Sequence, residues 1–243
     1  MVSGFHMSNK KKKIVVSGGT GRFGKVLKKN VDSNYLFPDK KQLDITSLKS
    51  VNNYLKKIKP KYFIHLAGLS RPLVKHVNNI EQSIKLNIIG TCNVTIACSI
   101  QNIKLIYFST SYVYPGTKGN YKESDPLLPI NNYAWSKLGG ESAVKMYKNS
   151  LIIRASMTEK PFVHKYAYAD MKTNFIFHDD FIKIFKKIIH KKGIINIGGP
   201  TKSVYNFAKK YNKNIKKKFL KNEKNCTMPS NASMNLTKLK KFI

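Results

Sequence analysis

The sequence is poor in acidic side chains, with 12 Asp and Glu against 45 Lys and Arg among 243 residues and a formal net charge of +33. Such a charge is typical of proteins that bind nucleic acid or an anionic membrane surface. The basic residues, however, are spread from one end of the chain to the other, and the sequence contains no zinc-finger spacing and no aromatic RNA-binding strand motif. We therefore expect no specific nucleic-acid partner, and we interpret the charge as compositional bias that also attracts anionic small molecules.

Cysteine is scarce as well. Cys92, Cys98 and Cys226 lack metal-ligand spacing, and their odd number favours reduced thiols. The first residues, "MVSGFHMSNKKKK", include no apolar segment of the kind that a secretory signal needs. No apolar run approaches the roughly 20 residues that cross a bilayer. We therefore predict a cytoplasmic protein without membrane contact, in which residues 1–12 form a disordered basic extension.

The apolar residues that are present, 42% of the chain, alternate between short β-branched runs and longer helical patterns. Strands are predicted near 13–17, 35–37, 61–68, 104–111 and 150–156, with helices between them. This alternation predicts βαβ units and an α/β fold, a Rossmann-type doubly wound parallel sheet. We expect an NAD(P)-binding domain at 13–156 and a small mixed α/β part at 157–243, interleaved with it, that binds the substrate.

A glycine-rich turn follows the first predicted strand. Gly18, Gly21 and Gly24 are spaced as G-x-x-G-x-x-G in "GGTGRFG" and precede a helical segment. Glycines permit the tight turn and let the backbone approach a pyrophosphate, while the helix N-terminus supplies N–H groups and a positive dipole. This context, more than the motif itself, predicts dinucleotide binding.

The choice of nicotinamide cofactor depends on the residues after the second strand. An acidic residue there would hold a ribose 2′-hydroxyl, and basic residues would accept a 2′-phosphate. The chain offers Asp39 but also Lys40 and Lys41, and Arg22 lies in the glycine turn. The positive charges outnumber the acid, so we predict NADPH, with NADH as the alternative.

Tyr133 and Lys137 in "YAWSK" are one helical turn apart and share a face. A free phenol has a pKa of about 10, and a neighbouring ammonium lowers it. The tuned phenol can act as a general acid toward a carbonyl oxygen. The segment "STSYVY", at the carboxyl end of a predicted strand, offers a hydroxyl that would orient that oxygen: Thr110, with its flanking serines as substitutes.

Together the glycine turn, "STSYVY" and "YAWSK" resemble the extended short-chain dehydrogenase/reductase family, and more closely its dTDP-4-dehydrorhamnose reductase branch, the sugar-nucleotide 4-ketoreductases. Four further segments are similar to that branch: "LDITSLKSV" at 43–51, "HLAGLS" at 65–70, "NIIG" at 87–90 and "MPSNASMNLTKL" at 228–239. The resemblance implies NAD(P)H-dependent reduction of a 4-keto-6-deoxy nucleotide sugar, in the biosynthesis of deoxysugar or glycan precursors.

The resemblance also implies roles for individual residues. Tyr133 would be the acid, Lys137 its partner on the nicotinamide ribose, Thr110 the carbonyl-orienting hydroxyl, and Asn87 a support for the proton relay. The predicted cofactor-binding residues are Gly18, Thr20, Gly21, Arg22, Phe23, Gly24, Asp39, Lys40, Asp44, Ile45, Leu66, Ala67, Gly68, Asn87, Tyr133 and Lys137. The predicted substrate-binding residues are Ser70, Ser111, Tyr112, Arg154 and Met157.

Two departures put the substrate in doubt. Met157 stands where the family commonly has a tryptophan, and the segment between Met157 and Asp179 is shorter than usual. Residues of "MTEKPFVHKYAY" would replace the lost contacts or form a solvated loop; the candidates are Lys160, Phe162, His164, Lys165 and Tyr166. No metal is expected, because His164 and His178 lack a third ligand.

Three alternatives to a simple reductase monomer remain open. A nucleotide-sugar epimerase or dehydratase shares the superfamily, but Ser111 stands where dehydratases usually carry an acidic residue. The branch also resembles the regulatory subunit of methionine adenosyltransferase, which would make this chain a non-catalytic NADP-binding subunit. A homodimer is suggested by analogy with relatives alone.

Overall fold

The computed structural model describes residues 12–223 and 227–243. The extension predicted at 1–12, except for Lys12, and Cys226 lie outside the described residues. The main sheet has six parallel strands in the order β10-β5-β4-β3-β1-β2. Their bounds are β1 (Ile14–Ser17), β2 (Tyr35–Leu36), β3 (Tyr62–His65), β4 (Lys104–Thr110), β5 (Ser150–Ala155) and β10 (Gly193–Ile197). The predicted parallel α/β sheet is confirmed.

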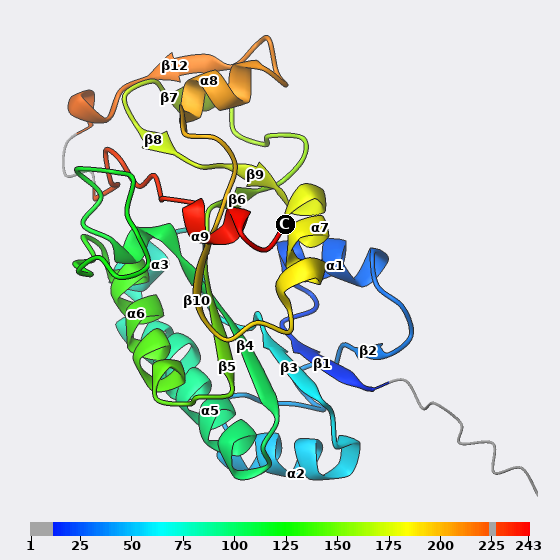
Figure 1. Cartoon of the computed structure of the whole chain (residues 1–243). Helices are drawn as coiled ribbons and strands as arrows, with labels where there is room; N and C mark the ends of the chain where they lie inside the picture. The colour runs from blue at the N-terminus through cyan, green and yellow to red at the C-terminus, as the bar shows by residue number, and fades with distance from the viewer. Residues whose placement is uncertain (1–11, 224–226) are drawn as a thin grey trace, which may run out of the picture.

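Helices cover both faces of this sheet (Figure 1). One face packs against α1 (Arg22–Lys29), α7 (His178–Ile188) and α9 (Thr237–Lys240), and the other against α2 (Leu48–Ile58), α5 (Gly90–Ile100) and α6 (Asn132–Lys145). Successive strand residues point to opposite faces, so Val16 packs on the face covered by α1, α7 and α9, while Val15 packs on the face covered by α2, α5 and α6. Strands buried on both faces explain why β4 and β5 have continuous apolar runs rather than alternating ones.

Local signals explain where two of the helices begin. Ser47 precedes α2, and its side chain accepts a hydrogen bond from the Ser50 backbone N–H, which satisfies one of the free donors of the first turn. Asn131 does the same for α6 by accepting from the Ala134 N–H. The cap on α6 fixes the start of the helix that carries Tyr133 and Lys137.

The C-terminal part of the chain lies at one end of the sheet, although α7 and β10 return to the sheet itself (Figure 1). It contains three strand pairs, α8 and the turn η3, and its core is aromatic, with Phe162, Phe177 and Phe207 buried together. The bounds are β6 (Met157–Thr158), β7 (Tyr166–Tyr168), β8 (Lys172–Thr173), β9 (Ile176–Phe177), β11 (Lys202–Ser203), α8 (Val204–Lys209), β12 (Lys216–Lys218) and η3 (Leu220–Asn222). The described segment from Met157 to Phe177 contains short strands and no helix.

The region before α5 is helical but irregular. It consists of α3 (Lys75–Asn78), α4 (Ile80–Ile84) and a π-helical turn, η1 (Lys85–Ile89). Contrary to our expectation about apolar runs, Ile80–Ile100 is long and apolar enough to span a membrane by length and composition, with 44% of its most apolar window buried. Its buried side chains, such as Val94 and Cys98, pack in the core of the domain. It therefore has the character of a core helix, and the absence of membrane contact stays a prediction.

Candidate active site

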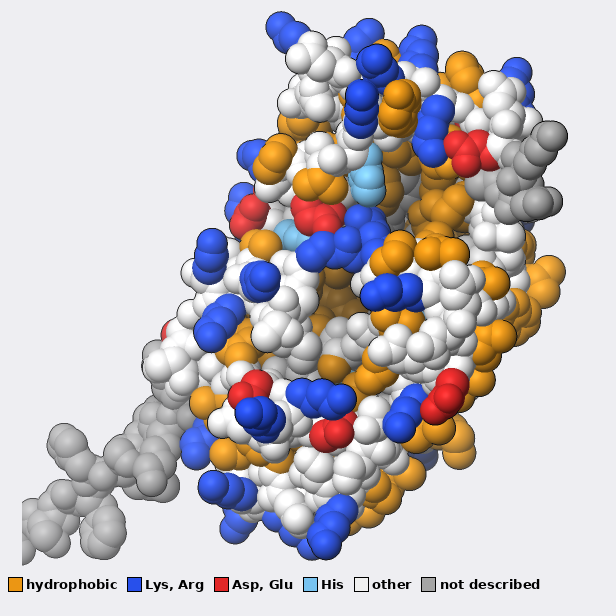
Figure 2. All heavy atoms as spheres, turned by 180° about the vertical axis from the view of Figure 1, so that it is seen from behind, with side chains coloured by type: hydrophobic (Ala, Val, Ile, Leu, Met, Phe, Trp, Pro, Cys, Tyr) orange, Lys and Arg blue, Asp and Glu red, His pale blue; other side chains and the backbone are white. Residues whose placement is uncertain are grey.

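A cavity of about 970 Å³ lies between the carboxyl ends of the strands and the C-terminal part, at the upper end of the usual ligand-pocket range of about 300–1,000 Å³. Figure 2 shows a hollow on this face with basic, acidic and histidine side chains at its rim. Most predicted site residues line the cavity: Gly18, Gly21, Arg22, Phe23, Gly24, Leu66, Gly68, Ser70, Thr110, Ser111, Tyr112, Tyr133, Lys137 and Met157.

The glycine turn forms one wall of the cavity. Gly18 has φ +78° and lies so close to the segment after β3 that a Cβ there would be 2.5 Å from the Ala67 backbone nitrogen. A Cβ on Gly24 would be 2.5 Å from the Gly18 carbonyl oxygen, so this glycine allows α1 to pack on the turn. Gly21, the N-cap residue of α1, offers no side-chain cap, and the first turn has no acidic residue. The backbone N–H groups in the first turn of α1 are thus available to an anion.

The close approach at Gly18 gives the first prediction. Gly18→Ala should destabilise the protein by about 1–3 kcal/mol more than Gly193→Ala, because overpacking adds to the left-handed backbone strain. Gly193 is the matched control, since its φ is +86° and a Cβ there would meet nothing within 4 Å. Urea denaturation compares the two variants, and equal losses of stability would show that Gly18 is not closely packed.

Thr110, Tyr133 and Lys137 also line the cavity, and the side chains of Thr110 and Tyr133 share a hydrogen bond. Thr110 ends β4, and its hydroxyl accepts a hydrogen bond from the Tyr112 N–H at 3.3 Å. The Tyr133 ring is packed edge-on against His76, with ring centroids 5.2 Å apart. The Lys137 ammonium lies 4.2 Å from the centre of the Tyr107 ring. The sheet end and one face of α6 thus bring the three predicted catalytic groups to a single wall.

Burial sets the proton affinities of the tyrosine and the lysine. Burial raises the pKa of Tyr133, while a side-chain hydrogen bond with Thr110 and the charges of Arg71 and Arg22 oppose this increase. Burial also lowers the pKa of Lys137 to about 7, against the opposing charge of Glu141. The predicted lowering of the Tyr133 pKa by Lys137 is thus not found: burial outweighs the opposing charges, and those charges come from Arg71 and Arg22. The phenol stays protonated near neutral pH, as a proton donor must, and the pKa of about 7 places Lys137 within the physiological range.

Asn87 lies in the π-helical turn and does not line the cavity. Its side-chain oxygen accepts from the Leu69 N–H at 2.7 Å, and its nitrogen donates to the Leu69 carbonyl and to the Ser136 hydroxyl, each at 2.8 Å. It therefore ties the loop after β3 to α6. Asn87 thus positions Gly68 and its neighbours, which do line the cavity, and its direct contact with a cofactor stays a prediction.

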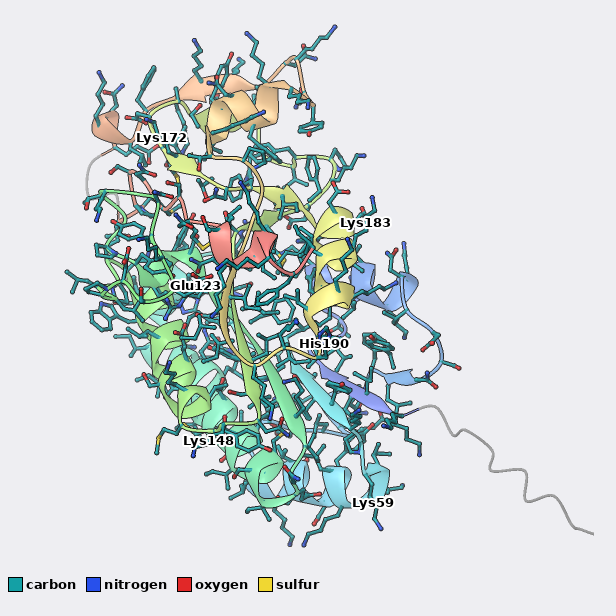
Figure 3. The ribbon with its side chains drawn as sticks, viewed as in Figure 1. Lys59, Glu123, Lys148, Lys172, Lys183 and His190 are labelled. Atoms are coloured by element: carbon teal, nitrogen blue, oxygen red, sulfur yellow. The ribbon has the colours of Figure 1, made fainter. Side chains whose placement is uncertain are left out.

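Arg154 is also outside the cavity, contrary to its predicted role in substrate binding. Its guanidinium is 2% exposed and pairs with Glu141 at 2.6 Å. It also donates to the Tyr114 hydroxyl at 2.8 Å and to the Glu123 carbonyl at 3.0 Å. Figure 3 shows Glu123 in the chain between β4 and α6, beside the strands. The arginine thus joins β5 to α6 and to this loop, and its donors are occupied by protein.

The remaining predicted cofactor residues outside the cavity lie beyond or beneath its wall. Asp39 and Lys40 are exposed, and Asp39 accepts a hydrogen bond from the Gln42 N–H. Asp44 accepts two hydrogen bonds from Thr46. Three residues remain. Thr20 is exposed, Ile45 is buried in the core, and the backbone of Ala67 packs closely against Gly18. A role for Asp39 toward a ribose 2′-hydroxyl, or for Lys40 toward a 2′-phosphate, stays a prediction.

Of the five residues in "MTEKPFVHKYAY" that were candidates to replace the lost substrate contacts, four line the cavity and one does not. Phe162, His164, Lys165 and Tyr166 belong to its wall, and Lys160 instead lies over the Phe177 ring. The described residues contain no group of three metal-ligating side chains. The segment after β6 thus lines the cavity with buried Phe162 and with the exposed side chains of His164, Lys165 and Tyr166, and its contact with a substrate stays a prediction.

Sequence reasoning missed two functional candidates, Arg71 and Glu159. Both line the cavity, and Glu159 pairs with Arg22 at 3.1 Å and with Arg71 at 3.5 Å. No local pattern marks either residue, because the contacts join segments far apart in sequence. Glu141, a structural residue whose charge acts on Lys137, could have been found, since it lies one helical turn beyond that lysine.

Comparisons with known proteins agree with this geometry. The family model of the RmlD substrate binding domain matches residues 12–173. The crystal structure of dTDP-4-dehydrorhamnose reductase from Bacillus anthracis str. Ames, in complex with NADP, is similar with a TM-score of 0.86 and 25% identity, over 95% of this chain and 92% of that chain.

Two curated relatives are similar in sequence. The dTDP-4-dehydrorhamnose reductase of Aggregatibacter actinomycetemcomitans is 26% identical over 202 residues, which cover 79% of this chain and 63% of that protein. Methionine adenosyltransferase 2 subunit beta of Pongo abelii is 28% identical over 143 residues, which cover 55% of this chain and 42% of that protein. The chain therefore spans less than two thirds of the length of each of these curated relatives.

Proposed function

Because this chain belongs to the RmlD substrate binding domain family, we propose that it is an NAD(P)H-dependent reductase of a 4-keto-6-deoxy nucleotide sugar. The observation that carries the proposal is that the glycine turn and the Thr110, Tyr133 and Lys137 side chains line one cavity. A dinucleotide can therefore lie with its phosphates at one wall and its reactive ring at the other. The similar reductases from two bacteria support the same activity.

The residues present fit a nicotinamide dinucleotide. Gly18, Gly21 and Gly24 line the cavity without side chains, so backbone can approach a pyrophosphate, and the uncapped N-terminus of α1 offers N–H donors to it. When bound, the reduced nicotinamide would supply the hydride. We favour NADPH over NADH, because Arg22 and Lys40 add positive charge and because the similar Bacillus anthracis reductase is in complex with NADP.

The three polar groups have separate roles in this proposal. Tyr133 would donate its phenolic proton to the ketone oxygen, and Thr110 would hold that oxygen in place. Lys137, when protonated, would bind the nicotinamide ribose and favour the phenolate that remains. Ser70, Ser111, Tyr112 and Met157 would contact the sugar from the surrounding wall.

The lysine gives a prediction about pH. With a pKa of about 7, Lys137 loses its ammonium as the pH rises through 7, so kcat/KM for NADPH should fall across this range. Lys137→Arg keeps the positive charge at high pH. Whatever activity this variant retains, its kcat/KM for NADPH should not fall as the pH rises through 7. A wild-type profile that is flat from pH 6 to 8.5 would contradict the assignment.

A second candidate function is a regulatory subunit without catalysis. The similarity to methionine adenosyltransferase 2 subunit beta favours it. Against it, a buried lysine, a protonated phenol and an oriented threonine hydroxyl are retained together on one cavity wall. An epimerase or dehydratase is disfavoured by Ser111, which occupies the position next to Thr110 without an acidic group.

The test is NADPH oxidation in the presence of a panel of 4-keto-6-deoxy nucleotide sugars. We expect turnover with at least one of them, one NADPH being oxidised for each sugar reduced. NADPH binding without turnover on any sugar would favour the regulatory subunit. A cytoplasmic location and a homodimer stay predictions that cell fractionation and light scattering would test.

A further inference from the structure

The cavity wall is strongly basic but contains one carboxylate. Among the described residues, the acidic side chain of the wall is that of Glu159 alone. The Lys and Arg side chains of the wall are Arg22, Arg71, Lys137, Lys165 and Lys218. Such a cavity attracts polyanions, and a single negative charge inside it opposes that attraction.

Glu159 is shared between two arginines from different segments. Its Oε1 lies 3.1 Å from Arg22 Nε, and its Oε2 lies 3.5 Å from Arg71 Nη1. The carboxylate is 18% exposed and the guanidinium groups are 44% and 36% exposed. Burial raises the pKa of Glu159, but its backbone hydrogen bond and the charges of both arginines leave the pKa below its usual value. Glu159 is therefore a charged and partly shielded partner of both arginines.

The two arginines lie where phosphate groups are expected. Arg22 is the first residue of α1, beside the glycine turn, and its second terminal nitrogen donates to the Ser70 hydroxyl at 3.1 Å. Arg71 follows Ser70 in the loop after β3, and Glu159 follows β6 in the C-terminal part. The carboxylate thus accepts from donors that face the cavity, as an entering phosphate oxygen would.

We propose that Glu159 is an internal counter-anion, which holds Arg22 and Arg71 in the absence of ligand and is displaced from them by the phosphate groups of an entering ligand. The proposal rests on the proposed function, because it requires a phosphate-bearing ligand in this cavity. Glu159 then lowers ligand affinity by competition. It also links occupation of the glycine turn to the position of the segment after β6.

The ion pair between Glu141 and Arg154 has a purely structural role and differs in its surroundings from the contacts of Glu159 with the two arginines. That pair is 5% and 2% exposed and lies outside the cavity wall, where no ligand competes for its donors. Glu159, in contrast, lines the space that a ligand would occupy. Partly exposed ion pairs contribute little to stability, so folding alone does not account for a carboxylate in this basic wall.

Inorganic pyrophosphate is the deciding probe, because it competes for the arginines without needing a dinucleotide site. Calorimetric titration should show that Glu159→Gln binds pyrophosphate about three- to tenfold more tightly than wild type, the factor expected for losing one or two partly exposed ion pairs. Asp180→Asn is the matched control. It removes the same charge from an exposed pair with Lys183 on α7, and Lys183 points away from the body of the protein (Figure 3).

A double variant separates competition from a general change in charge. In an Arg22→Gln background, Glu159→Gln should give a smaller gain in pyrophosphate affinity than it gives alone. Equal, weaker or undetectable pyrophosphate binding by Glu159→Gln, relative to wild type, would overturn the proposal. NADPH titration of the wild type is the separate test of the proposed function, which can fail while the pyrophosphate result still supports a counter-anion.

Discussion

Tyr133→Phe is expected to lower kcat for sugar reduction by about 10²–10⁴-fold, because it removes the only proton that the phenol can donate to the ketone oxygen. The ring of Phe fills the same space against His76, so the fold and NADPH affinity should change little. Stopped-flow NADPH oxidation measures the chemical step, and fluorescence titration measures cofactor binding.

Tyr54→Phe is the matched control for this change. Tyr54 lies on α2, outside the cavity wall, and removing its hydroxyl should leave kcat unchanged. Turnover by Tyr133→Phe within tenfold of the wild-type value would refute its role as the acid, and one of the hydroxyls around Thr110 would become the better candidate.

Glu141→Leu is expected to destabilise the protein by about 3–5 kcal/mol, because it leaves the buried Arg154 guanidinium without its counter-charge. Glu141 also accepts a hydrogen bond from the Ser109 hydroxyl at 2.6 Å, so α6 would lose its tie to β4 as well as to β5. The free energy of unfolding in urea measures the loss.

The double variant Glu141→Leu/Arg154→Leu tests the cause of that loss. Two apolar side chains in place of the pair remove the unpaired charge, so most of the stability should return. Asp180→Asn, in an exposed pair, should cost no more than about 1 kcal/mol. If Glu141→Leu is as mild as Asp180→Asn, the buried pair does not hold α6 against the sheet.

The sequence predicts the sheet, and it predicts that Thr110, Tyr133 and Lys137 come together, because both depend on local patterns. An apolar run bounded by glycine marks β1, and Ser47, a residue type that favours helix starts, caps the first turn of α2. Tyr133 and Lys137 share a face through helical spacing alone. Thr110 joins them because parallel strands end at one edge of the sheet.

The sequence does not predict contacts that tertiary packing creates. Arg154 follows the catalytic helix in a motif that suggests substrate binding, but β5 lies against α6 and the arginine is captured by Glu141. Arg22, Arg71 and Glu159 come from three distant segments, so their convergence needs the complete fold. Asn87 resembles a relay residue, but the π-helical turn directs it to Leu69 and Ser136.

The most direct measurement is a crystal structure of the protein with NADPH. Our account predicts the pyrophosphate at the Gly18–Gly24 turn, the nicotinamide ribose within hydrogen-bonding distance of Lys137, and the Tyr133 hydroxyl facing the reactive ring. A dinucleotide bound elsewhere, or a nicotinamide ring remote from Tyr133 and Lys137, would contradict it.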